Sequence, residues 1–170
     1  MEFNPNPNTN LNPAPNGAGI QKERTVSQIK EGTVIDHISH GKLFDLVKIL
    51  SLHKLEAGIV TAAANLPSTR CGKKGIIKIE GKFLSPEEVN KIAVISPNAS
   101  MSTIKDYRVH SKTKLVIPKV IQNIIKCNNP NCISNHEQID TKFHVMQQTP
   151  LKIKCNYCEV MINRENILIR

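Results

Sequence analysis

Hydrophobic and polar positions change their spacing several times along this chain, and each change predicts a new element. Residues 33–39 (TVIDHIS) alternate between the two kinds of side chain and are rich in β-branched residues, which is typical of a strand. Residues 41–52 place Leu43, Val47 and Leu50 on one stripe, the i, i+4, i+7 spacing of an amphipathic helix. The pattern therefore begins with a strand followed by a helix.

Further strand patterns follow this helix. The apolar runs 57–66 and 74–81 are predicted to be two strands, because a cluster of turn-forming residues separates them. Residues 101–111 alternate again and are predicted as one more strand.

A second helix is predicted over residues 85–95 (SPEEVNKIAVI), where the sequence marks the start clearly. Ser85 is the expected N-cap, Pro86 takes the first helical position, and Glu88 is placed to complete a capping box. This helix separates the last strand from the earlier ones.

The predicted order is β-α-β-β-α-β over about residues 26–112, which indicates an α+β fold. In the ferredoxin-like arrangement of this order, a four-stranded antiparallel sheet carries both helices on one face. The other face has to be covered or used for binding. Pro118 marks a junction, so the predicted domains are 23–117 and 118–170.

The first 22 residues differ in composition from the rest. Residues 1–20 contain six Asn and four Pro, and no Lys or Arg precedes Lys22. Such a segment buries too little apolar surface to offset the entropy lost on ordering. We expect a disordered arm over residues 1–22.

Four cysteines near the end of the sequence, Cys127, Cys132, Cys155 and Cys158, form the pattern Cys-x4-Cys-x22-Cys-x2-Cys. Two disulfides, one metal site or four unrelated reduced thiols are the alternatives. The sequence begins without the basic region and apolar run of a secretory signal, and no apolar stretch approaches the roughly 18 residues of a membrane span. We therefore expect a cytoplasmic protein without a membrane partner, where stable disulfides are rare.

Zinc explains the cysteine spacing, because a tetrahedral ion needs four soft donors that two close Cys pairs supply from two directions. The sequence predicts one structural Zn²⁺ per chain, which stabilises a small all-β, zinc-ribbon-like domain. His136 and His144 lie between the pairs, but four thiolates fill the shell without them. Cys71 lies in a turn-rich segment and is predicted to be an isolated thiol.

The formal net charge of +9 is unevenly distributed. Residues 21–119 hold 17 Lys and Arg against 9 acidic residues, whereas residues 120–170 hold 6 against 4. The metal domain is therefore close to neutral, and two Tyr and four Phe offer few platforms for stacking single strands. We expect the first domain to bind a small polyanion, and no nucleic-acid partner.

Known phosphate-binding and metalloprotease motifs are absent from the sequence. Asp36 and His37 are adjacent, but neighbours on a strand point to opposite faces, so we predict no acid/base pair there. Two rival hypotheses stay open on the residues alone: an enzyme that uses Asp36 or His37, and a zinc-ribbon protein that binds nucleic acid.

Short stretches carry a more specific signal: GTVIDHI at 32–38, NLPS at 65–68, IKIE at 77–80, FLS at 83–85, DY at 106–107, and the C-x4-C-ISNHE segment. In register from about Val26 onward, they resemble the regulatory chain of aspartate carbamoyltransferase, an enzyme of pyrimidine biosynthesis. The resemblance implies a non-catalytic subunit with an allosteric domain followed by a zinc domain.

The resemblance also implies partners and effectors. The first domain of such a chain forms a homodimer, and the second docks on the catalytic chain. The typical holoenzyme is a dodecamer of six catalytic and six regulatory chains. CTP and UTP are the implied inhibitors, and ATP is the implied activator.

An effector site follows from the same resemblance. It assigns a backbone contact with the base to Ile29, ribose and base contacts to Asp36 and Lys78, and phosphate contacts to His37 and Lys112. The complete implied set is Ile29, Val34, Asp36, His37, Lys78, Tyr107, Val109 and Lys112. Lys74 would add charge nearby, and Ser102 stands where relatives often have Asn.

For the zinc domain, the four cysteines match the ligands of the family without departure. The resemblance places contacts with the catalytic chain at residues on or beside the two thiol-bearing turns, namely Asn129, Asn131, Tyr157 and Glu159. A closed shell of four thiolates has no open position for water, so the implied zinc is structural.

Overall fold

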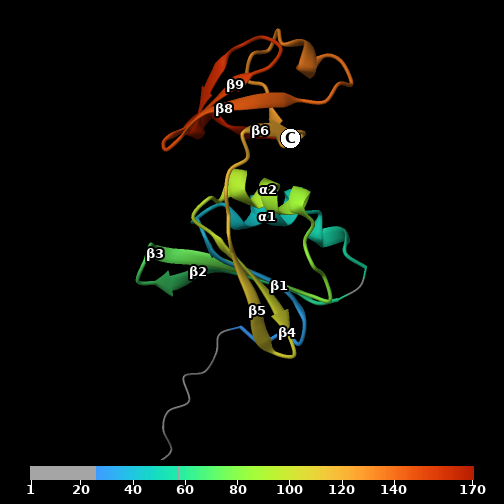
Figure 1. Cartoon of the computed structure of the whole chain (residues 1–170), viewed down its shortest axis with the longest axis vertical. Coiled ribbons are helices and arrows are strands. Elements are labelled where there is room, and N and C mark those ends of the chain that lie inside the picture. Colours follow the sequence, from blue (N-terminus) through green and yellow to red (C-terminus); the bar gives the residue numbers. More distant parts are fainter. Residues whose placement is uncertain (1–25, 57) are drawn as a thin grey trace, which may run out of the picture.

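The structure, a computed structural model, describes residues 26–56 and 58–170. Two units are stacked along its long axis (Figure 1). The α+β unit contains β1 to β5 with α1 and α2, and the β unit contains β6 to β11. Both α-helices lie between the first sheet and the β unit, so they cover one face of that sheet. The arm predicted over residues 1–22 lies outside the described residues.

The elements of the α+β unit are β1 (Gly32–Ile38), α1 (Leu43–Ile49), the 3-10 turn η1 (Leu52–Lys54), β2 (Val60–Ser68), β3 (Gly72–Glu80), α2 (Pro86–Ile95), β4 (Ser100–Lys105) and β5 (Arg108–Lys114). Those of the β unit are β6 (Val120–Gln122), β7 (Ile125–Lys126), η2 (Ile133–Asn135), β8 (Lys142–Gln148), β9 (Leu151–Cys155), β10 (Met161–Asn163), η3 (Arg164–Asn166) and β11 (Leu168–Ile169). No helix of the described part of the chain is long and apolar enough to cross a membrane.

The first sheet confirms the α+β prediction and adds a strand to it. Its strand order is β2-β3-β1-β4-β5, and every neighbouring pair is antiparallel. The four strands from β2 to β4 have the ferredoxin-like order. In the β unit, one sheet has the order β10-β9-β8-β6, and β11 pairs with β7.

The extra strand, β5, corrects the prediction of a single strand over residues 101–111. The chain turns back at Asp106 and Tyr107, which both have positive φ angles (49° and 60°), and β5 pairs with β4. This left-handed turn suits the twist of a hairpin, but its usual marker is a glycine. Because Asp106-Tyr107 carries no such marker, the alternation of residues 101–111 continues through the turn without a break in the sequence pattern.

The start of α2 is built as predicted. Ser85 Oγ accepts a hydrogen bond from the Glu88 amide (3.3 Å), and Glu88 Oε2 accepts one from the Ser85 amide (2.9 Å). Lys82 Nζ lies 2.6 Å from Glu88 Oε1. Burial acts to raise the pKa of Glu88, but the bonds from Lys82 and Ser85 outweigh it and hold the pKa below its usual value.

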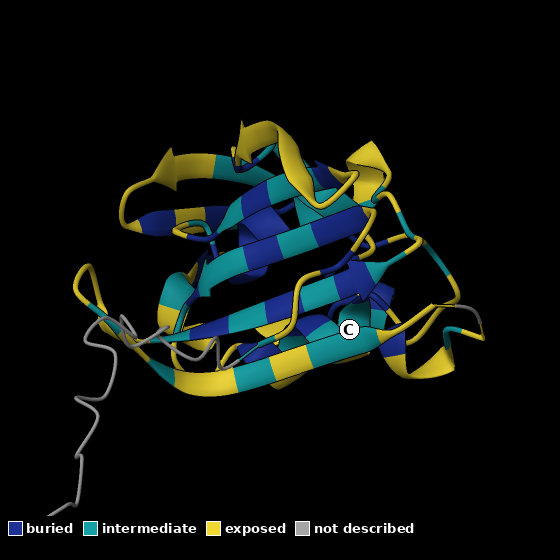
Figure 2. Cartoon of the chain, turned by 90° about the horizontal axis from the view of Figure 1, so that it is seen from below, coloured by how far each residue is buried: buried dark blue, intermediate teal, exposed yellow. Residues whose placement is uncertain are grey.

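Alternation along the strands separates the core from the open face of the first sheet. Ile35 and Ile77 are fully buried and belong to the same hydrophobic cluster as Leu46 of α1. One position along, Val34 and Lys78 are half-buried and lie on the face that the helices do not cover. Figure 2 looks onto this face from below.

The two units share one continuous core. Its buried cluster runs from Ile95 in α2 through Ile117 in the connecting segment to Ile121 in β6. At the same junction, Arg164 Nη2 donates to the carbonyl oxygen of Ile95, at the end of α2 (3.2 Å). Burial lowers the pKa of Arg164, while the charge of Glu165 acts in the opposite direction.

Replacing the N-cap of α2 tests this account of the fold. Ser85→Ala removes one half of the capping box, and we expect it to lower the free energy of unfolding by about 1 kcal/mol. Urea unfolding of the full chain, followed by circular dichroism, measures the effect. Ser111→Ala, on exposed β5, is the matched control and should unfold as the unmodified chain does. Equal midpoints for the two variants would contradict the capping role.

Candidate functional site

The four predicted cysteines come together in the β unit. Their sulfur atoms all lie within 4.8 Å of one another, although the residues come from two loops far apart in the sequence. Cys127 follows β7 and Cys132 precedes η2, whereas Cys155 ends β9 and Cys158 lies in the turn after it. The structure thus brings together the complete set that the spacing predicted.

Side-chain and backbone hydrogen bonds hold each loop in shape. In the first loop, Asn135 Nδ2 donates to the carbonyl oxygens of Cys127 and Asn129, both at 2.8 Å. In the second, the Cys155 amide donates to the Val160 carbonyl oxygen (3.0 Å), and Glu159 adopts a positive φ of 58° that closes the turn. The thiols are therefore positioned by the loops themselves.

Distances between the sulfurs fit a tetrahedral ion. Cys127 Sγ lies 3.6 Å from Cys158 Sγ, and Cys132 Sγ lies 3.8 Å from Cys155 Sγ. Four sulfurs placed about 2.3 Å from a central Zn²⁺ would be about 3.8 Å apart. All four cysteines are free of disulfides, so the metal alternative fits and the disulfide alternative does not.

The pKa values of these thiols show what a bound cation would have to offset. Burial raises the pKa of Cys127 and of Cys155, because a thiolate is costly to hold away from water. Burial acts in the same direction on Cys158, but hydrogen bonds, first among them one from the Val160 amide, bring its pKa down to about 7. A divalent ion would stabilise the thiolate form of the whole set.

The other metal-binding residue types lie outside this cluster. His136 Nε2 lies 2.7 Å from the Pro130 carbonyl oxygen, and His144 Nε2 lies 3.0 Å from Asn156 Oδ1. Both rings are therefore engaged elsewhere, as the sequence suggested. Cys71 is exposed at the turn between β2 and β3, with its sulfur 3.3 Å from Ser68 Oγ.

A second candidate site is a hollow of about 270 Å³ on the open face of the first sheet. The residues that line it are Gln28, Ile29, Val34, Asp36, Lys78, Ser100, Ser102, Ile104, Tyr107, Val109 and Lys112. Seven of the eight residues that the resemblance implied are in this set. His37 is not, although it is adjacent to Asp36 in the sequence.

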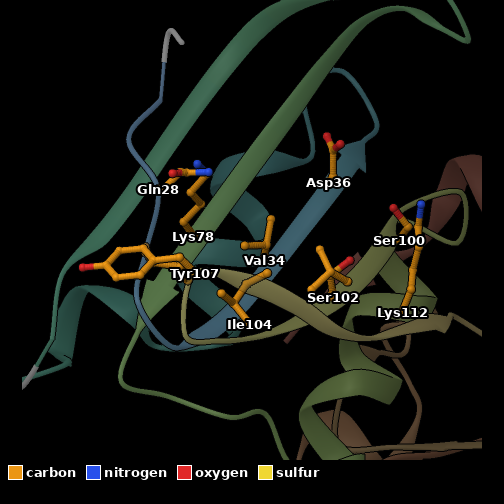
Figure 3. A pocket seen from close by; sticks show the side chains of 11 residues that line it. Gln28, Val34, Asp36, Lys78, Ser100, Ser102, Ile104, Tyr107 and Lys112 are labelled. Carbon is orange, nitrogen blue, oxygen red and sulfur yellow. The ribbon is translucent and has the colours of Figure 1, made fainter.

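Strand register explains why distant residues meet in this hollow. Lys78 on β3 is opposite Val34 on β1, Val34 is opposite Ser102 on β4, and Ser102 is opposite Lys112 on β5. These four side chains form one row across four strands, on the face that the helices leave open. Figure 3 shows Lys112 at one end of the hollow and Lys78 and Tyr107 at the other.

Asp36 and His37 correct a prediction. Because the register shifts between Ile35 and Ile38, β1 has a bulge, and His37 adopts a positive φ of 57°. His37 Nδ1 then lies 3.3 Å from Asp36 Oδ2, and the His37 amide donates to Asp36 Oδ1 (2.7 Å). Neighbours on a regular strand would have pointed apart, but here the two side chains are in contact.

Lys74 completes this cluster, with Nζ 2.8 Å from Asp36 Oδ1. Burial acts to raise the pKa of Asp36, but the bond from Lys74 and the His37 amide hold it below its usual value. The folded-state pKa is therefore the depressed one, so this carboxylate stabilises the fold above about pH 4, and the contribution is lost as the pH falls below that.

Lys78 shapes the hollow from its other end. Its Nζ donates to the carbonyl oxygens of Val26 (3.2 Å) and Ser27. These bonds draw the segment before β1 along the sheet, which brings Gln28 and Ile29 to the rim. Lys78 thus holds part of the wall as well as lining the site.

Three lining residues, Gln28, Ser100 and Ile104, were missed from the sequence. The alternation of β4 places Ser100, Ser102 and Ile104 on one face, which was the available signal. It could not be used without knowing that β4 neighbours β1. Gln28 carried no local signal, because its place depends on the bonds of Lys78.

Comparison with known proteins gives consistent results for both parts of the chain. Residues 24–116 match the family model of the aspartate carbamoyltransferase regulatory chain, allosteric domain. Residues 119–168 match that of its metal binding domain. The two matches together cover most of the sequence, including both candidate sites.

Individual relatives extend this likeness. A regulatory chain of aspartate carbamoyltransferase from Pyrococcus abyssi is 53% identical over 147 residues, which are 86% of this chain and 97% of the relative. One from Thermococcus kodakarensis is 49% identical over 84% of this chain and 93% of the relative. One from Methanococcus maripaludis is 49% identical over 85% and 96%, respectively.

Replacing one cysteine tests the metal centre. Cys132→Ser removes a buried sulfur ligand, so we expect the bound zinc to fall from one per chain to near zero, because three thiolates do not close the shell. Metal analysis of the freshly purified full chain is the measurement.

Cys71→Ser is the matched control, since it also removes one thiol but lies outside the cluster. It should keep its zinc. Zinc retained by Cys132→Ser, or no metal in the unmodified chain, would contradict the assignment of the centre.

Proposed function

The chain belongs to the family of aspartate carbamoyltransferase regulatory chains, and on this basis we propose that it binds nucleoside triphosphates and transmits their effect to a catalytic partner. Regulatory chains of this family are non-catalytic subunits, with an allosteric domain and a metal-binding domain. The observation that carries the proposal is the row of Lys78, Val34, Ser102 and Lys112 across the open face.

The open-face hollow suits a nucleotide because its two ends differ. Lys112 and Ser100 lie at one end, while Tyr107, Gln28 and Lys78 lie at the other (Figure 3). A lysine is a point-charge donor that suits phosphate oxygens, and backbone and amide groups are suited to reading a base edge. We propose that phosphates bind toward Lys112 and His37, and that the base lies toward Ile29 and Tyr107.

Asp36 is prepared for a ribose in this scheme. Its contacts with Lys74 and the His37 amide keep it ionised and fixed, so it accepts hydrogen bonds from hydroxyl groups without further reorganisation. The hollow is close to the lower limit of roughly 300 Å³ for small-molecule pockets, so base and ribose would fill it and the triphosphate would extend outside.

Effector identity follows the family: CTP and UTP as inhibitors and ATP as activator. Each would act by binding with different affinity to two states of the holoenzyme. A coupling of about 1–3 kcal/mol between sites changes an apparent affinity about 5- to 150-fold. Ser102, where relatives often have Asn, lies in the centre of the row and would tune this response.

We assign the β unit to docking on the catalytic chain. Asn131, Tyr157 and Glu159 are exposed around the thiol cluster, and Asn129 is half-buried beside them. One Zn²⁺ held by Cys127, Cys132, Cys155 and Cys158 would fix these loops, and with its shell closed it supplies structure and no chemistry. The centre thus stabilises a contact surface.

Assembly is proposed as in the family: a homodimer through the α+β unit, within a dodecamer of six catalytic and six regulatory chains. The edge of the first sheet at β2 supports a pairing of this kind, because an edge strand offers unpaired backbone groups. We place the protein in the cytoplasm, where thiols stay reduced and available for zinc. No nucleic-acid partner is proposed, since the metal unit is close to neutral.

Lys112→Gln tests the nucleotide site. Loss of a charged hydrogen bond to phosphate is worth about 1.5–3 kcal/mol, so the dissociation constant for CTP should rise about tenfold or more. Isothermal titration of the full chain measures it. Lys105→Gln, an exposed lysine of β4 outside the hollow, should leave the affinity unchanged. Equal affinities for the two variants would exclude this pocket as the site.

Reconstitution tests the subunit role. Mixed with its catalytic partner, the zinc-loaded chain should form a large complex whose aspartate saturation curve shifts with nucleotides. A thiol-blocking reagent should release the regulatory chains and abolish the shift, while catalytic activity remains, because only the docking surface is lost. Size-exclusion chromatography and the activity assay are the measurements.

The outcomes of this experiment separate two claims. Failure to form any complex would overturn the subunit role. A complex that forms and shows no nucleotide response would overturn the effector assignment and leave the docking role intact.

A further inference from the structure

A second hollow, of about 610 Å³, lies at the junction of the two units. One wall comes from α1, η1 and α2, and the other comes from Asn123 and residues 167–170 of the β unit. The helices of the first wall cover one face of the first sheet, and the open-face hollow lies on the other face (Figure 1). The junction hollow is therefore separate from the site described above and shares no lining residue with it.

Positive charge dominates the first wall. Lys48, Lys54 and Lys91 line the hollow, as do Lys42 and Asp45. Asp45 Oδ2 lies 3.1 Å from Lys42 Nζ, so this acid and this base neutralise each other. Among the described residues, the amino groups of the other three lysines make no ion pair.

Lys91 is the most informative of the three. Glu87 precedes it by one helical turn, a spacing that favours an ion pair, yet the described part of the chain contains no ion pair between them. Lys91 is half-buried and lines the hollow, and in the described part of the chain its amino group makes no ion pair with an acidic residue. Lys48 lies in the last turn of α1 and Lys54 in the last turn of η1, where a positive charge suits the carbonyl end, whereas Lys91 has no such place in α2.

We propose that this junction hollow is a second anion site, which takes a compact phosphate anion with several negative charges. Lysines from α1, η1 and α2 converge on one concavity, where their fields add instead of diverging into solvent. Each ammonium offers three N–H donors to phosphate oxygens. No Phe, Tyr or Trp is among the described lining residues, and the imidazole of His53 is the one ring there, so the site offers little surface for stacking a nucleobase.

An anion in this position contacts both units. Lys91 belongs to α2 and faces the same hollow as Asn123 and Ile169 of the β unit. Occupancy would therefore stabilise the present arrangement of the units, in addition to the bond between Arg164 and Ile95. The proposal does not depend on nucleotide binding at the open face.

Lysine footprinting of the zinc-loaded full chain tests the site, with inorganic pyrophosphate as the probe. At about three times its dissociation constant, three quarters of the sites are filled, so acylation of Lys48, Lys54 and Lys91 should slow about fourfold. Mass spectrometry of the acylated peptides reports each lysine separately. Lys105, exposed on β4 and outside both hollows, is the internal reference and should react at the same rate throughout.

Two comparisons distinguish pyrophosphate binding in the junction hollow from charge screening and from binding elsewhere. Sodium chloride at the same ionic strength should not protect the three lysines, and equal protection by it would overturn the proposal as charge screening. Protection of Lys112 alone would place the pyrophosphate in the open-face hollow and would likewise overturn it.

A double variant gives an independent measurement. In the Lys112→Gln background, which weakens the first site, Lys48→Gln with Lys91→Gln should weaken pyrophosphate binding about tenfold or more by titration calorimetry. Lys105→Gln in the same background should bind as the parent does. Both variants keep exposed or half-exposed polar side chains, and equal unfolding midpoints verify that the fold is intact. Unchanged affinity in the double variant would overturn the proposal.

Discussion

Convergence of four cysteine sulfurs is the constraint on which the β unit depends. The strands of this unit are short, from two to seven residues, and too little apolar surface is available to fix loops as long as those around η2. Cys127, Cys132 and Cys155 are nonetheless buried within the same cluster as Phe143 and Ile153. A structural zinc ion, whose binding is worth about 10–16 kcal/mol in zinc-finger peptides, would hold β7, η2 and β9 together at one point.

From that point, contacts continue into the rest of the molecule. β7 leads directly to Cys127 and pairs with β11, whose neighbour η3 carries Arg164 to the end of α2. α2 in turn packs on the sheet whose other face holds the open-face hollow. Continuous packing therefore connects the thiol cluster with the open-face hollow. Coupling between the two sites requires an element with two alternative arrangements, whose balance changes when either site is occupied. The junction between the units, which also holds the proposed second anion site, lies along this route.

The open-face hollow shows how one irregularity prepares a site. A bulge in β1 turns His37 back toward Asp36, and Lys74 from β3 closes the cluster. The result is a carboxylate that stays ionised although it is half-buried, because its partners outweigh the cost of burial. Regular alternation would have left these groups on opposite faces, so the strain at one positive φ angle is what brings them together.

The sequence by itself determined the elements whose signals are local: the helix after Ser85, the alternating strands β1 and β3, and the four thiols with metal spacing. It also carried the family, because short stretches such as GTVIDHI are specific in themselves. Tertiary structure alone decided the hairpin at Asp106, the contact of Asp36 with His37, and the place of Gln28. Each of these depends on a neighbour brought close by pairing or by a distant hydrogen bond, and such partners leave no mark on local spacing.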